Sequence, residues 1–111
     1  MSAIDKAKFE ELKQISGEDF INELIDAFLE DAPAMLKTMQ TALNANDVES
    51  FRRNAHSLKS NAYTFGAMEL GALAKELEQI ARENNLDVGD RLERLNESFG
   101  NVAQELRGLR L

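Results

Sequence analysis

Apolar residues recur at alternating steps of three and four along most of this 111-residue chain. The clearest run consists of Val48, Phe51, Ala55, Leu58, Ala62 and Phe65. Such spacing puts apolar side chains on one stripe of an α-helix that packs lengthwise against other helices. Abundant Ala, Leu, Glu, Lys and Gln, with a single proline and few β-branched residues, favour helix throughout, and no segment convincingly resembles a strand.

This periodicity predicts five helical segments. They span approximately residues 5–15, 18–43, 48–65, 68–84 and 88–109. The second is either one helix kinked at Pro33 or two abutting helices, because proline disrupts a helix interior. Either Asn46 or Asp47 is expected to cap the start of the third helix, and Gly66 to cap its end. Asp87 is expected to cap the fifth.

The first helix is short and is expected to cover the core as a lid, with Phe9, Leu12 and Ile15 facing inward. Phe20 begins the apolar stripe of the second segment. Four long amphipathic segments with short connections predict an all-α fold, an antiparallel up-down four-helix bundle with a short additional N-terminal helix. The length and the 43% hydrophobic content fit a single domain over residues 1–111.

Composition narrows the possible functions. A formal net charge of −7 would repel a nucleic acid backbone and an anionic membrane surface. The chain has no cysteine, no apolar run long enough to cross a membrane, and charged residues where a signal peptide would be apolar. We therefore expect a soluble cytoplasmic protein that binds neither nucleic acid nor membrane and is a monomer.

The chain has one histidine, His56, on the polar flank of the third helix, about 120° from the centre of its apolar stripe. Arg52, Arg53 and Lys59 surround it, and no acidic residue occurs from Ser50 to Met68. The imidazole is thus predicted to stand in a basic surface patch of an otherwise acidic chain.

An exposed imidazole that is mostly uncharged near neutral pH is a nucleophile suited to accept a phosphoryl group. Lys59, one turn along the helix, could neutralise phosphoryl oxygens, and the small side chains of Ser57, Ser60 and Asn61 leave room for an approaching protein. A lone surface histidine is also commonly a solvated residue without a role, and the residue pattern alone leaves both interpretations open.

The segment Ala55-His56-Ser57-Leu58-Lys59, followed by Gly66-Ala67, resembles the signature of the histidine-containing phosphotransfer (HPt) domain family. In that signature His-x-Leu-Lys-Gly precedes Gly-Ala or Gly-Leu. The resemblance extends over essentially the whole chain, from Phe28–Pro33 to Leu77-Glu78.

The resemblance implies that His56 is the phosphoacceptor and that Lys59 assists the phosphate. Gly66 would be the family glycine that ends the helix, whereas Ser60 replaces the usual glycine after the lysine. Glu78 falls where some members place a glutamine or glutamate beside the histidine; it either orients the imidazole or is an exposed helix residue.

The family also implies a phosphorelay protein of two-component signalling, without ATP-binding kinase activity and without a cofactor or metal ion of its own. Its partners would be the receiver domains of a hybrid sensor histidine kinase and of a response regulator, with Mg²⁺ on the receiver. The binding residues would be Arg52, Ser57, Ser60, Asn61, Tyr63, Gly66, Ala32, Met35 and Leu36. Met35 and Leu36 could equally belong to the core.

The chain resembles a stand-alone relay protein. The alternative is a helical adaptor that docks or sequesters a receiver domain without being phosphorylated. A hydrolase or metalloenzyme has little support, because a single histidine without cysteine leaves only carboxylates as further ligands.

Overall fold

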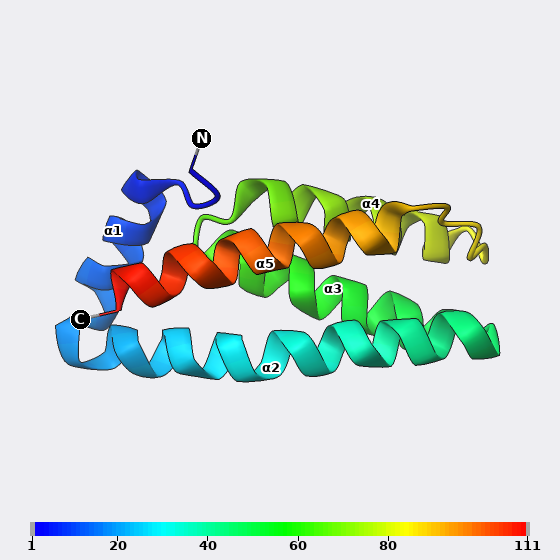
Figure 1. Ribbon diagram of the computed structural model, residues 1–111, viewed down its shortest axis with the longest axis horizontal. Helices are drawn as coiled ribbons and strands as arrows, with labels where there is room; N and C mark the ends of the chain where they lie inside the picture. Colours follow the sequence, from blue (N-terminus) through cyan, green and yellow to red (C-terminus); the bar gives the residue numbers. More distant parts are fainter. Residues whose placement is uncertain (1, 111) are drawn as a thin grey trace.

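The computed structural model describes residues 2–110, which form five α-helices and no strand (Figure 1). The helices are α1 (Lys6–Ser16), α2 (Glu18–Ala45), α3 (Val48–Thr64), α4 (Met68–Arg82) and α5 (Arg91–Leu109). The prediction of an all-α fold is confirmed.

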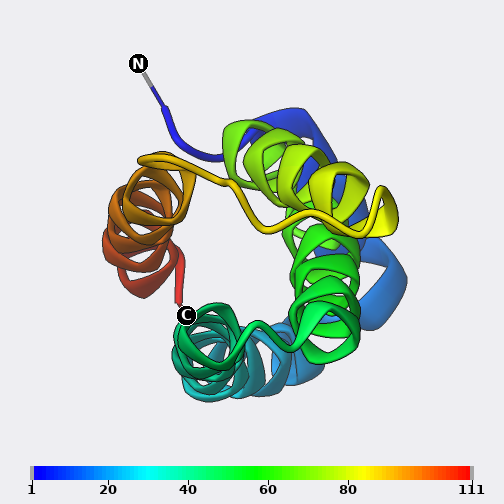
Figure 2. The same ribbon diagram turned by 90° about the vertical axis from the view of Figure 1, so that its right-hand side faces the viewer.

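Helices α2, α3, α4 and α5 surround one core, as the end-on view in Figure 2 shows. Each contacts its two neighbours in the ring: α3 packs on α2 and α4, and α5 packs on α4 and α2. Helix α1 lies at one end of the molecule and contacts α2 and α3. The 28 residues of α2 correspond to about 42 Å of helix, so α2 spans the 41 Å length of the molecule.

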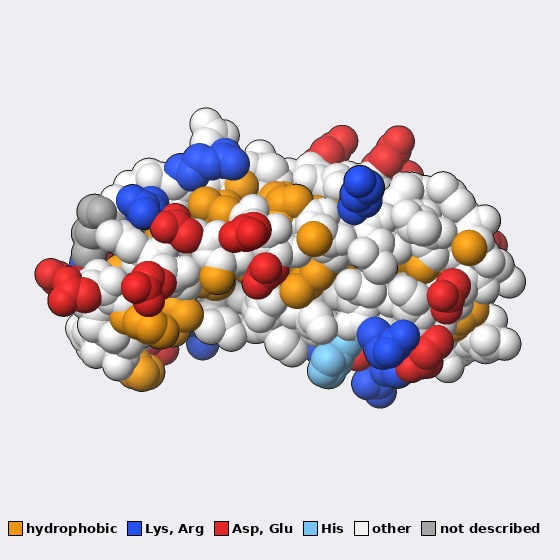
Figure 3. Space-filling view, turned by 90° about the horizontal axis from the view of Figure 1, so that it is seen from below, with side chains coloured by type: hydrophobic (Ala, Val, Ile, Leu, Met, Phe, Trp, Pro, Cys, Tyr) orange, Lys and Arg blue, Asp and Glu red, His pale blue; other side chains and the backbone are white. Residues whose placement is uncertain are grey.

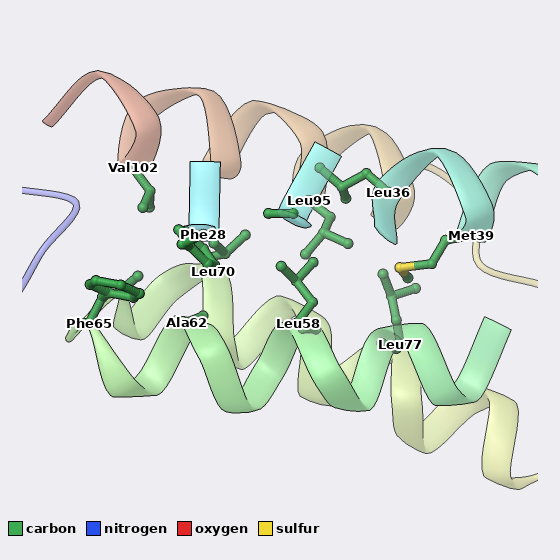
Figure 4. Packing of buried hydrophobic residues seen from close by; sticks show 14 of the residues in the cluster. Phe28, Leu36, Met39, Leu58, Ala62, Phe65, Leu70, Leu77, Leu95 and Val102 are labelled. Atoms are coloured by element: carbon green, nitrogen blue, oxygen red, sulfur yellow. The ribbon is translucent and has the colours of Figure 1, made fainter. Parts of the chain in front are cut away.

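The core is formed by the apolar stripes that the periodicity predicts (Figure 4). Phe51 and Leu58 of α3, Leu77 of α4 and Leu95 of α5 are fully buried. Phe28 of α2 supports the end of α3, because its ring centroid lies 5.0 Å from that of Phe65. Aromatic pairs at this separation add to the stability that apolar burial supplies.

Helix α2 passes through Pro33 without interruption, which is the first of the two predicted alternatives. Pro33 lies on the exposed side of α2. The carbonyl that loses its helical donor there can be hydrogen-bonded by water, so the helix tolerates the proline. Asp47, one of the two predicted caps, accepts a hydrogen bond from the backbone N–H of Ser50 at 3.1 Å.

The start of α5 differs from the prediction. Asp87 was expected to cap a helix beginning at Val88, but α5 begins at Arg91. The backbone N–H of Asp87 donates to Asn85 Oδ1, and Gly89 has a φ of 58°, which holds the chain in a turn. Val88 lies before the helix but is nevertheless buried, so its apolar side chain extends the sequence pattern of the helix beyond its actual start.

Two apolar residues expected to face inward are exposed. Ile15 is 85% exposed and Phe20 is 49% exposed. The buried face of α1 centres on Phe9. Ile15 is six residues farther along, which rotates it by about 120° from that face. The inward orientation predicted for Ile15 and Phe20 is therefore wrong.

Candidate functional site

Helix α3 presents His56 to solvent because the residues around it anchor the opposite face of the helix. Ala55 and Leu58 are fully buried, whereas the His56 side chain is 51% exposed. The space-filling view shows the histidine on the surface beside a group of Lys and Arg side chains (Figure 3). A reaction partner can therefore reach the ring without any movement of the core.

Glu78 of α4 holds the imidazole from the inside. Its Oε2 lies 2.6 Å from His56 Nδ1, although the two residues are 22 positions apart. Glu78 is only 3% exposed. A carboxylate is rarely buried to this extent unless it is paired. Glu78 is therefore not an exposed helix residue, and its carboxylate contacts the imidazole ring.

Two cations, Lys59 and Arg82, also share this carboxylate. Lys59 Nζ donates to Glu78 Oε1 at 2.6 Å, and Arg82 Nη2 donates to Oε2 at 3.2 Å. Lys59 lies three residues after His56 on α3, and Arg82 lies four residues after Glu78 on α4. Each cation is therefore one helical turn from the residue that it accompanies. Arg82 is a site residue that the sequence reasoning missed; its spacing from Glu78 was the available signal.

The ionisation of Glu78 follows from these contacts. Burial raises its pKa, but hydrogen bonds and charge from Lys59 and His56 outweigh burial and lower the pKa to about 2. The carboxylate is therefore ionised at neutral pH and only accepts hydrogen bonds. Because the carboxylate only accepts, Nδ1 of His56 is the proton donor in this contact, and Nε2 has a free lone pair whenever the ring is uncharged.

The surface around His56 carries less net positive charge than the acid-free segment of the sequence predicts. Arg52 Nη2 lies 2.5 Å from Glu49 Oε1, and Arg53 Nε lies 3.8 Å from the same oxygen. The hydrogen bond from Arg52 lowers the pKa of the Glu49 carboxyl, so this pair is ionised as well. Two carboxylates therefore lie among the basic side chains around His56. Glu49 comes from the turn just before the acid-free segment, and Glu78 comes from α4.

The other predicted binding residues are placed differently from one another. Ser57 and Ser60 are exposed, and Asn61, Tyr63 and Met35 are half-buried. Gly66 is buried at the turn after α3. Ala32 and Leu36 belong to the core, and Figure 4 shows Leu36 among the buried side chains. Ala32 and Leu36 are thus wrong as surface contacts, because the helical face they share also carries Phe28 and Met39 into the core.

The described residues contain no group of three or more His, Cys, Asp and Glu side chains arranged to hold a metal ion. None of the helices described is long and apolar enough to cross a membrane.

The all-α fold, the exposed imidazole on a buried carboxylate and the lysine beside it fit the class of histidine phosphotransfer proteins. A family comparison agrees: the Hpt domain matches residues 23–108. The chain therefore belongs to the Hpt domain family. Membership of this family makes it a phosphorelay intermediate of two-component signalling.

Similar proteins support this assignment. The chain is 29% identical over 83 residues to the phosphorelay protein LuxU of Vibrio harveyi, covering 75% of this chain and 73% of that protein. It is 28% identical over 85 residues to LuxU of Vibrio vulnificus strain YJ016, covering 77% and 74%. Its fold matches the crystal structure of histidine-containing phosphotransfer protein B (HptB) from Pseudomonas aeruginosa PAO1 with a TM-score of 0.91 and 30% identity, covering 96% of this chain and 93% of that chain.

Proposed function

We propose that His56 is the residue that carries the phosphoryl group. It would accept this group from a phospho-aspartate of one receiver domain and pass it to an aspartate of a response regulator. The observation that carries the proposal is the 2.6 Å contact of His56 Nδ1 with the buried Glu78 carboxylate. This contact leaves Nε2 as the nucleophilic nitrogen of an exposed ring.

The transfer step requires no general base. The Nε2 lone pair attacks phosphorus and forms the N–P bond, while the P–O bond to the receiver aspartate breaks and its electron pair leaves with that carboxylate. The ring then bears both Nδ1–H and Nε2–P and is positively charged. Glu78 stabilises this charge, because its carboxylate accepts the Nδ1 hydrogen bond. Passing the phosphoryl group on to the next aspartate reverses the same steps.

Lys59 and Arg82 would neutralise the transferred group. Lys59 is only partly exposed and hydrogen-bonds Glu78, which holds its ammonium near the ring. Arg82 is more exposed and approaches the same carboxylate from the next turn of α4. Phosphoryl transfer depends mainly on positioning and charge stabilisation, which these cations supply.

The partners proposed are the receiver domains of a hybrid sensor histidine kinase and of a response regulator. The Mg²⁺ ion would belong to the receiver, and this chain would carry no cofactor and no ATP-dependent kinase activity of its own. His56, Lys59, Glu78 and Arg82 all come from one chain, so a monomer suffices to build the site. The location that we propose for it is the cytoplasm. The net charge of −7 argues against nucleic acid as a partner.

We also propose that α2 to α5 form an antiparallel up-down four-helix bundle, with α1 as the additional short helix, in a single domain of residues 1–111. The closed ring of helix contacts and the short connections support this arrangement (Figures 1 and 2). The contact of His56 with Glu78 requires neighbouring faces of α3 and α4 and fits the same topology.

The test is phosphoryl transfer from a phosphorylated receiver domain. The protein should gain an acid-labile, base-stable phosphate, and His56→Gln should gain none while its helical circular dichroism is unchanged. If the wild-type chain takes up no phosphate from any receiver of its organism, the proposal that His56 carries the phosphoryl group is wrong. Addition of EDTA should stop transfer between the chain and the receiver, since the metal is expected there.

A further inference from the structure

Gly71 of α4 forms a notch that the ring of Tyr63 from α3 occupies. A Cβ atom built on Gly71 would lie 2.5 Å from Tyr63 Cε1, 2.7 Å from Cδ1 and 2.8 Å from Cζ. These distances are too short for any real side chain. The aromatic ring therefore rests directly on the backbone of α4, and only glycine at position 71 allows this contact.

This contact is particular to Gly71. Gly100 and Gly108 also lie within a helix, in α5, but a Cβ atom on either would meet nothing within 4 Å. Glycine in a helix interior lowers helix stability relative to alanine. Gly71 has a packing reason for its presence, whereas the contacts around Gly100 and Gly108 give none.

The Tyr63–Gly71 contact is in register with the phosphohistidine site. Tyr63 is seven residues after His56 on α3, and Gly71 is seven residues before Glu78 on α4. Seven residues are about two helical turns, or about 10.5 Å, so both contacts use the same pair of helix faces. The two helices therefore meet at two matched points, one at Tyr63–Gly71 and one at His56–Glu78.

The site has little tolerance for relative movement of α3 and α4. Both Glu78 contacts to α3, with His56 Nδ1 and with Lys59 Nζ, are 2.6 Å long. Hydrogen bonds weaken steeply as they lengthen or bend. A ring seated in a backbone notch resists sliding of the helices, because a shift of register would drive the ring against the neighbouring turns of α4.

We propose that Tyr63 and Gly71 are positioning residues for the phosphohistidine site. Their contact fixes the register of α3 and α4 that keeps Glu78 on His56 and Lys59. In this role Tyr63 acts from within the protein through Gly71, rather than as a contact for the receiver domain. The inference rests on His56 being the phosphoacceptor. The effect of Tyr63 and Gly71 on the His56–Glu78 hydrogen bond is measured independently of phosphoryl transfer.

The experiment compares five variants of the full chain. Gly71→Ala forces the ring out of the notch, Tyr63→Ala removes the ring, and Tyr63→Phe keeps it. The double variant Gly71→Ala/Tyr63→Ala adds the methyl group where no ring opposes it. Gly100→Ala is the matched control, since it is the same substitution in a helix with open space around it.

Two measurements need no receiver domain. Proton and nitrogen NMR of the imidazole reports the hydrogen-bonded Nδ1–H of His56. Phosphoramidate reports the reactivity of the ring: the Nε2–P bond forms while the P–N bond of the reagent breaks and ammonia leaves. Thermal unfolding and circular dichroism verify that each variant is folded.

Gly71→Ala and Tyr63→Ala should lose the Nδ1–H signal and react about tenfold more slowly with phosphoramidate, as expected for a misplaced reacting group. The double variant should be no worse than Tyr63→Ala, and Tyr63→Phe and Gly100→Ala should match the wild type. A retained Nδ1–H signal in both Gly71→Ala and Tyr63→Ala overturns the proposal. So does a Tyr63→Ala variant that is impaired only with receiver domains.

If Gly71→Ala does not fold, the comparison of Tyr63→Ala with Tyr63→Phe decides the question. Failure of the functional proposal is recognised separately, because the wild type would then take no phosphate on His56 while the NMR comparison could still succeed.

Discussion

The Glu78 carboxylate accepts one hydrogen bond from His56 Nδ1 and another from Lys59 Nζ, each 2.6 Å long. One oxygen thus contacts the imidazole ring, and the other holds a cation that a phosphoryl group on this ring would attract. Once His56 is phosphorylated, Lys59 faces two anions, the Glu78 carboxylate and the phosphoryl group. Arg82 also contacts Glu78, so it can neutralise the carboxylate when Lys59 turns toward the phosphoryl group.

Replacing Glu78 by Gln should shift the phosphoryl group toward the receiver. The amide oxygen can still accept from Nδ1–H, but it offers no negative charge to the phosphorylated ring. Charged hydrogen bonds exceed neutral ones by about 1 kcal/mol, which corresponds to about fivefold in the equilibrium. The measurement is the ratio of phosphorylated chain to phosphorylated receiver at equilibrium.

Glu76→Gln is the control for this shift, because Glu76 lies on the same helix and forms an exposed ion pair with Arg91. It removes the same charge without touching the site. An equal shift in both variants would mean that overall charge, and not the contact with the ring, sets the equilibrium.

Stability should fall in acid because of Glu78. Its pKa in the folded protein is about 2, against an ordinary value of 4.5. The unfolded chain therefore binds the proton first as the pH falls, so the contribution is complete above pH 4.5 and is lost between 4.5 and 2. The difference in pKa corresponds to about 3 kcal/mol.

Urea unfolding over this pH range checks the prediction. The wild type should lose this increment, and Glu78→Gln, which has no carboxyl to titrate there, should lack it. Asp26 and Glu49 also have a lowered pKa, but they are exposed and such pairs contribute little. Parallel acid profiles of the two proteins would contradict the assignment.

Lys59→Ala should slow phosphoryl transfer and also reduce stability by about 1–3 kcal/mol, since buried Glu78 loses one of its donors. The fold should persist, because His56 and Arg82 still contact the carboxylate. Transfer kinetics and urea unfolding measure the two effects. Lys75→Ala, at an exposed lysine of α4, should change neither; a normal transfer rate in Lys59→Ala would refute the role of the lysine.

The local features of this fold could be predicted from the sequence. The helical stripes, the Asp47 cap and the exposed flank that carries His56 depend on neighbours within one or two turns. The boundary before α5 could not, because Val88 is buried from a turn and so continues the apolar period of the helix.

The chemistry of the site depends on contacts between helices. That Glu78 is buried, and that it neutralises the Lys59 charge, follows from how closely α3 approaches α4. Helical periodicity places Glu78 on a face of α4 but does not give this approach. For the same reason the pattern did not distinguish Leu36, which is in the core, from half-buried Met35 one position earlier.

Gly66→Ala should destabilise the fold by at least about 2 kcal/mol, because two effects add. Gly66 has a φ of 81°, and a Cβ atom there would lie 2.8 Å from the backbone oxygen of Asp5. The N–H of Asp5 donates to the Gly66 carbonyl at 2.7 Å, so the segment before α1 cannot move away without losing this bond. Urea unfolding measures the loss.

Gly89→Ala separates the two effects. Gly89 also has a positive φ, 58°, but its added Cβ would meet only the Arg91 side chain at 3.7 Å, an ordinary contact. This variant therefore experiences the backbone strain alone and should be less destabilised than Gly66→Ala. Equal losses would show that the approach of Asp5 to Gly66 contributes nothing beyond the strain.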